Sequence, residues 1–264
     1  MKIPFVKAHG ALNDFLLTWR ADAPDGDRFA MARAICDRHA GIGADGWMLV
    51  DPPVDAKAEG AVQLFNSDGS AAEFSGNGTR CAAAFLIRAG FGASLVRVAT
   101  GSGVRTLRLL ERVDRHFVFE MDMGRPAVTS LNFYLPLTEG RRDVTVLWVG
   151  NPQCSLPVEN FEFDWRGLGA EIEKHRHFPN RTNVSFFQVV DEHTIDVRFY
   201  ERGAGPTMSS GSGSTGAAVT AVARGLVKSP VRVQTPAGPI DVRVEDDVYL
   251  TGPAEVVAEG EFWM

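Results

Sequence analysis

The chain has 264 residues, of which 23% are charged and 45% are hydrophobic, and its formal net charge is −6. This balance is typical of a soluble globular protein and gives no reason to expect nucleic acid or an anionic membrane surface as a partner. No apolar run approaches the roughly 20 residues that a membrane-spanning helix needs. We therefore expect a cytoplasmic protein that acts on a small molecule.

The cysteines and histidines indicate neither disulfides nor a metal. The three cysteines, Cys36, Cys81 and Cys154, are an odd number without CxxC spacing, which argues against a disulfide framework and a zinc site. His175 and His177 form an H-x-H pair, but no acidic or cysteine cluster completes a metal site near them. We expect reduced, mostly buried cysteines and no metal.

The predicted elements, taken in chain order, describe two similar halves. The first half contains a helix over residues 27–41, a strand at 61–65, a Gly-rich turn and Ala-rich helix from Ser75, and strands at 96–100 and within 104–122. Gly124 and Pro126 then interrupt the pattern. The second half contains a strand at 144–149, a helix over 166–176, a strand at 194–200, a second Gly-rich turn and helix from Ser210, and a strand at 231–235.

The two Gly-rich segments are an internal repeat. Shifting the sequence by 135 residues aligns Ser75 with Ser210 and gives 12 identities in the 29 positions from Ser75 to Gly103. Roughly two identities are expected by chance, so the pattern indicates a duplication. We predict an α+β fold of two pseudo-symmetric domains, each a mostly antiparallel curved sheet or barrel around a central helix. Residues 1–122 form the first half and residues 123–253 the second, with the tail from 254 to 264 packing back onto the first.

Each Gly-rich turn is a candidate anion site, because backbone N–H groups at a helix start have no partner inside the helix. Serine could instead simply cap each helix. The two copies, each preceded nine positions earlier by a polar residue (Asn66 and Glu201), favour a functional reading. Neither turn has the Gly-Lys-Ser/Thr ending of a nucleotide-binding P-loop. Ligands usually bind between domains, so we expect the turns to face each other.

Six motifs occur in order along nearly the whole chain: KAHGALNDFLL, RHAGIGADG, FNSDGSAAEFSGNGTRC, GNPQC, RTNVSFF and YERGAGPTMSSGSGSTGAA. Together they resemble the diaminopimelate epimerase family. The resemblance implies a cofactor-free isomerase that inverts an α-carbon of diaminopimelate, in the biosynthesis of lysine and peptidoglycan precursors. Its partner would be this small amino acid, and its two domains would enclose the site.

The resemblance also implies the binding residues. The reacting carboxylate would lie at the two helix N-termini, at Gly76, Asn77, Gly211 and Ser212. The distal amino-acid end would be bound by Asn66, Asn151, Asn183, Glu201 and Arg202, with Asn13 lining the site. An arginine fork can bind a carboxylate bidentately, and asparagine amides offer donors and acceptors around charged groups.

The chain departs from the family at its proton-transfer positions. The family's two catalytic cysteines fall on Ser75 and Ser210, and a histidine that partners the first cysteine is replaced by Gln153. An acidic residue of the second turn is Pro206. A hydroxyl has no accessible deprotonated form at neutral pH without a strong base beside it. Glu201 could be that base for Ser210, whereas none is evident for Ser75.

Four functions stay open on the sequence. The leading one is an amino-acid epimerase of the diaminopimelate type. The second is a one-base isomerase or a dehydratase acting on a related amino acid. The third is an inactive relative that only binds an amino acid. The fourth is a chain in which both cysteines were exchanged for serine to trap a ligand, although this does not account for Gln153 and Pro206. The oligomeric state is open between a monomer and a homodimer.

Overall fold

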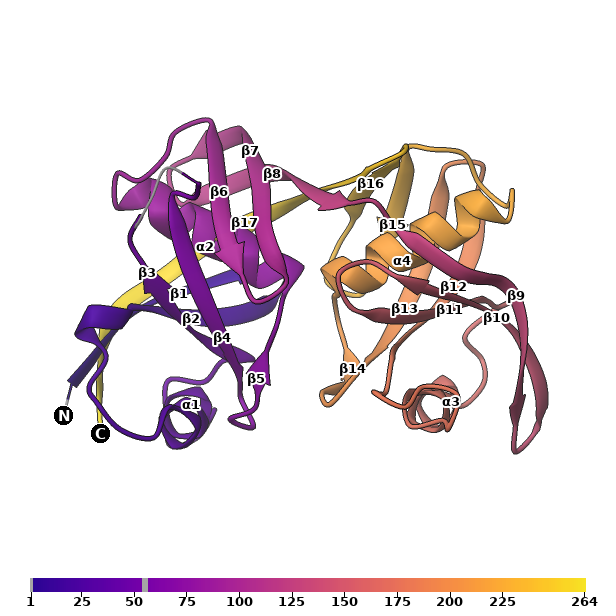
Figure 1. Ribbon diagram of the computed structural model, residues 1–264, viewed down its shortest axis with the longest axis horizontal. Helices are drawn as coiled ribbons and strands as arrows, with labels where there is room; N and C mark the ends of the chain where they lie inside the picture. The colour runs from indigo at the N-terminus through magenta and orange to yellow at the C-terminus, as the bar shows by residue number, and fades with distance from the viewer. Residues whose placement is uncertain (1, 54–56) are drawn as a thin grey trace. The chain divides into compact units, whose positions relative to one another are not determined.

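The computed structural model describes residues 2–53 and 57–264 (Figure 1). The chain divides into an N-terminal unit of residues 1–121 and 252–264 and a C-terminal unit of residues 122–251. Two strands, β8 and β17, run from one unit into the other. In the described ranges no helix is long and apolar enough to span a bilayer.

The N-terminal unit is built on a closed ring of eight strands. Hydrogen bonds join β1 to β2, β2 to β3, β3 to β4, β4 to β6, β6 to β7, β7 to β8, β8 to β17 and β17 back to β1. The pairs β2–β3 and β4–β6 are parallel, while β5 adds a short antiparallel strand to β4. The elements are β1 (Lys2–Gly10), β2 (Asn13–Trp19), η1 (Arg20–Asp22), α1 (Arg28–Cys36), β3 (Gly46–Asp51), β4 (Gly60–Asn66), β5 (Ala71–Ala72), α2 (Gly76–Arg88), β6 (Leu95–Thr100), β7 (Gly103–Val113), β8 (His116–Gly124) and β17 (Val248–Trp263).

The C-terminal unit repeats this strand order. Antiparallel pairs join β9 to β10, β10 to β11, β12 to β13, β15 to β16 and β16 to β17, and parallel pairs join β11 to β12 and β13 to β15. Strand β14 pairs with β13 as β5 does with β4. The elements are β9 (Ala127–Leu137), β10 (Gly140–Trp148), β11 (Pro152–Pro157), α3 (Trp165–Glu173), β12 (Asn183–Asp191), β13 (Thr194–Glu201), β14 (Gly205–Thr207), α4 (Gly211–Ala223), β15 (Val231–Gln234) and β16 (Ile240–Val244).

The strand registers extend the repeat beyond the stretch that the sequence aligns. Leu64 pairs with Ala72 in the first unit, and Phe199 pairs with Thr207 in the second, so both members of the pair are 135 positions further along. The same offset relates the register of β6–β7 to that of β15–β16. The predicted α+β fold of two similar halves is confirmed.

The central helices α2 and α4 are buried almost from end to end. Every residue of α2 from Gly76 to Ile87 and every residue of α4 from Gly211 to Ala221 is buried. Helix α2 packs on β1, β2, β6 and β7, and α4 packs on β10, β11, β12, β13, β15 and β16 (Figure 1). A helix enclosed by strands on all sides needs small side chains, which accounts for the Ala and Gly content of both repeats.

Helices α1 and α3 cover a second core in each unit. The first contains Ile35, Trp47 and Phe65, and the second contains Ile172 and Phe186. Both helices are shorter than the predicted ranges 27–41 and 166–176. Helix α1 ends because Asp37 adopts an extended backbone (ψ 128°).

Candidate active site

Ser75 is the N-cap of α2. Its backbone is extended (φ −134°, ψ 122°), and its Oγ accepts a hydrogen bond from Gly78 N at 3.1 Å. Thr79 closes the same turn, because its Oγ1 donates to Ser75 O at 2.7 Å. Gly76 and Asn77 occupy the first two helical positions, where N–H groups have no acceptor inside the helix and the helix dipole is positive. The turn therefore has the chemistry of an anion-binding site.

Ser210 caps α4 with nearly the same geometry. Its backbone angles are φ −144° and ψ 120°, and its Oγ accepts from Gly213 N at 3.1 Å. The side chain differs from that of Ser75 in a second bond, since Ser210 Oγ also donates to Glu201 Oε1 at 2.6 Å. Within the described part of its own unit, Ser75 Oγ has no carboxylate or imidazole partner. The hydroxyl of Ser210 is thus paired with a carboxylate, whereas the described contact of the Ser75 hydroxyl is its cap bond from Gly78 N.

Asn66 and Glu201 occupy equivalent places, each at the last residue of a strand that leads toward a Gly-rich turn. Asn66 Nδ2 donates to Ser70 Oγ at 3.0 Å in the hairpin between β4 and β5. The repeat thus carries a neutral amide on one side and a carboxylate on the other. Pro206, where the family has an acidic residue, is exposed on β14. Glu201 therefore supplies the carboxylate of the second turn.

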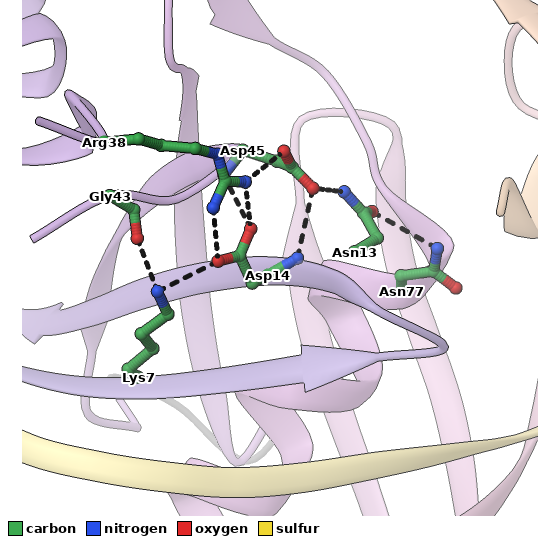
Figure 2. A network of polar contacts seen from close by, with 7 residues as sticks. All are labelled: Lys7, Asn13, Asp14, Arg38, Gly43, Asp45 and Asn77. Atoms are coloured by element: carbon green, nitrogen blue, oxygen red, sulfur yellow. Dashed lines mark hydrogen bonds and ion pairs between the residues drawn. The ribbon is translucent and has the colours of Figure 1, made fainter. Parts of the chain in front are cut away.

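Asn13 and Asn77 join β2 to the start of α2. Asn77 Nδ2 donates to Asn13 Oδ1 at 3.2 Å, and Asn13 Nδ2 donates to Asp45 Oδ2 at 2.6 Å (Figure 2). From within the helix, Arg80 Nη2 donates to Asn77 Oδ1 at 2.6 Å. Asn77 is 1% exposed and Arg80 is fully buried. The sequence placed Asn13 and Asn77 in the site, and the structure brings them into direct contact.

A charged cluster holds Asp45 in place behind Asn13. Arg38 donates through Nη2 to Asp14 Oδ1 and to Asp45 Oδ1, both at 2.8 Å, and Lys7 Nζ lies 3.0 Å from Asp14 Oδ2 (Figure 2). Burial alone would raise the pKa of Asp14, but the hydrogen bonds from Arg38 and Lys7 outweigh it and lower that pKa. Asp14 therefore stays ionised at neutral pH and pairs with Arg38 and Lys7.

In the C-terminal unit, Asn151 and Gln153 bind the start of α4. Asn151 Nδ2 donates to Ser212 Oγ at 3.1 Å, and Gln153 Nε2 donates to Asn151 Oδ1 at 2.6 Å and to Ser212 Oγ at 3.2 Å. Asn151 precedes β11 where Asn13 begins β2, and each contacts the second residue of the following buried helix. Gln153 is buried and cannot act as a general base, because an amide does not titrate.

Asn183 and Arg202, also in the C-terminal unit, are joined by a hydrogen bond. Asn183 Nδ2 donates to Pro152 O at 3.0 Å, and its Oδ1 accepts from Arg202 N at 3.0 Å. One guanidinium nitrogen, Arg202 Nη1, donates to Asn180 O at 3.3 Å. Asn183 therefore fixes the backbone from which Arg202 projects.

The cysteines are not substitutes for the missing thiols. All three are free and buried, and burial raises the pKa of Cys36 and of Cys81 to about 12 and raises that of Cys154 further. They are neutral core side chains at neutral pH. Among the described residues, no group of His, Cys, Asp and Glu side chains could hold a metal ion. His175 Nε2 instead lies 2.9 Å from Pro136 O, and the His177 ring stacks on Phe133.

Asp45 and Arg80 are the polar groups that reasoning from sequence missed. Asp45 lies inside the motif RHAGIGADG, but nothing in its spacing indicates a contact with Asn13. Arg80 lies in the repeated helix, where the aligned position of the second copy is Thr215. The alignment of the two halves sets this charged residue against a neutral one inside a helix of mostly small residues. That mismatch was a signal for Arg80, because a charged side chain in a buried helix needs partners.

Comparison with known proteins agrees with these motifs. The family model for diaminopimelate epimerase matches residues 5–129 and 145–257. A diaminopimelate epimerase of Halothermothrix orenii is 34% identical over 278 aligned positions, covering 99% of this chain and 98% of the relative. Another, of Pelotomaculum thermopropionicum, is 36% identical and covers 98% of both chains.

Solved structures share the fold at low sequence identity. A hydroxyproline epimerase from Agrobacterium vitis, with bound trans-4-hydroxy-L-proline, superposes with a TM-score of 0.78 at 16% identity, over 98% of this chain and 92% of that one. A methylitaconate-delta-isomerase gives a TM-score of 0.71 at 14% identity, over 99% and 95%. The family model matches most of the chain, and the two diaminopimelate epimerases match it over 98% of their own length. The chain therefore belongs to the diaminopimelate epimerase family of isomerases.

Proposed function

We propose that this protein is a cofactor-independent isomerase of diaminopimelate, or of an amino acid like it with charged groups at both ends, and that Ser210 and Glu201 form its proton-transfer pair. The observation that carries the proposal is the 2.6 Å hydrogen bond from Ser210 Oγ to Glu201 Oε1 at the N-terminus of α4. A carboxylate beside a hydroxyl can accept a proton that the hydroxyl alone cannot hold at neutral pH.

Substrate recognition in this proposal uses both repeats. The reacting carboxylate accepts hydrogen bonds from backbone N–H groups at the first two positions of each buried helix, where the helix dipoles favour an anion. The distal carboxylate binds the guanidinium of Arg202, and the distal ammonium binds amide oxygens. The residues assigned to these contacts are Gly76, Asn77, Gly211 and Ser212 for the reacting end, and Asn13, Asn66, Asn151, Asn183, Glu201 and Arg202 for the rest.

The proposal makes the two faces of the α-carbon chemically unequal. Inversion requires a base on one face and an acid on the other, and each contributes about 10²–10⁴-fold to a rate. Ser210 has Glu201 beside it, while Ser75 has the Gly78 N–H as its partner and the neutral amide Gln153 stands where the family has a histidine. Proton exchange at one face is therefore faster than inversion.

This inequality favours a second candidate function, a one-base isomerisation or an elimination. Either reaction removes a proton from a single face, which the Ser210–Glu201 pair can serve without help from Ser75. The product differs: inversion of diaminopimelate gives the meso stereoisomer, whereas elimination acts on a related amino acid with a hydroxyl on its β-carbon and releases water and an unsaturated amino acid, which hydrolyses to a keto acid and ammonia. In all versions we expect the protein to work in the cytoplasm, and a homodimer stays a prediction.

Incubation with L,L-diaminopimelate in deuterated water separates the candidates. Proton NMR reports loss of the α-proton, and chiral chromatography reports the meso product. Deuterium incorporation that exceeds inversion supports the proposal as stated. Equal rates would contradict the inequality of the two faces, and tight binding without exchange would reduce the protein to an amino-acid-binding relative. An unsaturated or keto product from a β-hydroxy amino acid, offered in a parallel assay, would establish elimination.

A further inference from the structure

Three hydrogen bonds in the N-terminal unit run in one direction through two side-chain amides. Arg80 donates to Asn77 Oδ1 at 2.6 Å, Asn77 donates to Asn13 Oδ1 at 3.2 Å, and Asn13 donates to Asp45 Oδ2 at 2.6 Å. We propose that Arg80 and Asp45 are positioning residues that lock the amides of Asn77 and Asn13 in one orientation and thereby fix the first turn of α2, whose backbone N–H groups bind the substrate carboxylate. This inference rests on the proposed function.

The two ends of this chain of bonds determine its direction. A guanidinium has donors and no acceptor, and an ionised carboxylate has acceptors and no donor. Arg80 therefore requires the oxygen of Asn77, and Asp45 requires the nitrogen of Asn13. A flip of either amide would set a donor against a donor or an oxygen against an oxygen. An isolated Asn pair has no such restraint, because each amide can turn over at little cost.

The guanidinium of Arg80 has no freedom to move away from Asn77. It is fully buried, and its Nε donates to Pro253 O at 3.0 Å. Two glycines leave room for it, since a Cβ at Gly10 or at Gly252 would stand 3.1 Å from the guanidinium group. Burial lowers the pKa of Arg80 to about 10, which keeps the side chain protonated at neutral pH.

The other end is fixed by charge. Asp45 accepts hydrogen bonds from Arg38 Nη2 at 2.8 Å and from Asp14 N at 3.2 Å (Figure 2). These two bonds orient its carboxylate independently of Asn13. A sequence of aligned hydrogen bonds strengthens each member, because every donor is polarised by the next. The orientation of Asn77 thus depends on groups at both ends of the network.

The consequence for a ligand lies in the backbone. Asn77 is the second residue of α2, so the lock on its side chain also fixes the backbone N–H groups of that first turn, which bind the substrate carboxylate in the proposed function. The C-terminal unit solves the same problem without charge: the positions aligned with Asn77 and Arg80 are Ser212 and Thr215, and a hydroxyl reorients by rotation. At the position aligned with Arg80 the C-terminal unit has the neutral Thr215, so the lock by a buried arginine described here is a feature of the N-terminal unit.

Three variants test the inference. Arg80→Met removes the donors, Arg80→Lys keeps a donor-only cation, and Asp45→Asn removes the acceptor-only end. Arg88→Met is the matched control, because Arg88 lies in the same helix and pairs at its far end with Glu259. Calorimetric titration gives the Kd for L,L-diaminopimelate, thermal melting checks the fold, and NMR of the ¹⁵N-labelled side-chain amides of Asn13 and Asn77 reports their orientation.

We expect Arg80→Met to raise Kd about tenfold, which corresponds to about 1.4 kcal/mol. Arg80→Lys and Arg88→Met should stay within about threefold of the wild type, on the scale where a tenfold change equals about 1.4 kcal/mol. The amide signals should broaden or double in Arg80→Met and in Asp45→Asn alone. A folded Arg80→Met with wild-type Kd and sharp amide signals would overturn the inference.

Two further outcomes are decisive. If Arg80→Met fails to fold, Asp45→Asn decides, because Asp45 is exposed enough to tolerate the change, and an unaltered Kd and amide spectrum there would refute the locking role. If the wild type does not bind L,L-diaminopimelate, the proposed function fails. The amide spectra still test the lock in that case, so the two failures are distinguishable.

Discussion

Ser210 Oγ lies 2.6 Å from Glu201 Oε1 and donates a hydrogen bond to that carboxylate. Among the residues that the structure describes, Ser75 Oγ has no such carboxylate partner, although the two serines share a cap geometry and a repeat position. In that part of the chain the duplicated scaffold has two equivalent backbone sites, and a side-chain base is paired with the serine of the second. The first prediction follows from this pair.

Glu201→Gln should lower the rate of deuterium exchange at the α-carbon of L,L-diaminopimelate, at saturating substrate, by at least about 10²-fold. The reason is that it removes the carboxylate that is hydrogen-bonded to the Ser210 hydroxyl. The measurement is proton NMR of the α-signal over time. Glu192→Gln is the control, since Glu192 is exposed and pairs with Lys228. Exchange at the wild-type rate in Glu201→Gln would remove the pair from the mechanism.

Gly213→Ala should reduce the rate of α-deuterium exchange by at least about tenfold while the protein stays folded, because a small displacement of a catalytic group lowers the rate strongly. A Cβ at Gly213 would stand 2.9 Å from Ser210 Oγ and 2.8 Å from the Phe199 ring, so the hydroxyl must move. Gly216→Ala is the matched control in the same helix, because its Cβ would meet Gln153 at 3.3 Å. Equal activity in both variants would show that the position of Ser210 Oγ is irrelevant.

The duplicated fold was predictable because glycine and alanine spacing is a local property that a repeat preserves. The offset of 135 residues located α2, α4 and the strands that follow them. A barrel, and a tail that packs back onto the first half, were expected, but the pairing and register that close the ring were not predictable, because they join β17, the last strand of the chain, to β1, the first. Pairing between strands this distant leaves no periodicity in either strand.

The residues of the candidate site likewise divide into those that the sequence predicts and those that it does not. The turn residues Ser75 and Ser210 follow from local pattern, and the Asn set follows from the family motifs. The contacts of Asp45 and Arg80 do not, because the bond from Asn13 to Asp45 spans 32 positions and depends on the parallel pairing of β2 with β3. A hydrogen bond that only tertiary structure creates has no signature in a single sequence.

Asp14→Asn should destabilise the protein by about 2 kcal/mol at pH 7, because it removes charged hydrogen bonds to Arg38 and Lys7. The pKa of Asp14 is lowered in the folded state, so its contribution is present above the unfolded pKa and is lost as the pH falls through the folded one. Urea denaturation at pH 7 and at pH 3 should therefore show a smaller difference at pH 3. Exposed Asp114→Asn is the control, and a difference that does not depend on pH would contradict the assignment.

The thiols should resist labelling in the folded protein. Burial raises the pKa of Cys36 and Cys81 to about 12, and that of Cys154 further, so no thiolate is accessible at pH 8. Ellman's reagent should report no reactive thiol in native buffer and all three in denaturant. A thiol that reacts quickly in the native state, and whose modification stops α-proton exchange, would mean that a cysteine does take part.

Exchanging both serines for cysteine should restore efficient inversion. Ser75→Cys with Ser210→Cys places a titratable thiol at the N-terminus of each buried helix, where the dipole lowers a thiol pKa. Each tuned acid or base contributes about 10²–10⁴-fold, so the formation of meso-diaminopimelate should rise by orders of magnitude. Either single exchange should gain less, because inversion needs an acid and a base on opposite faces.

Gln153→His should add to the gain at Ser75→Cys by returning an imidazole to the family's position. Chiral chromatography of the product measures each step, and titration calorimetry confirms that binding is kept. A triple variant that binds diaminopimelate yet neither exchanges nor inverts its α-proton would show that the substrate or the reaction is a different one.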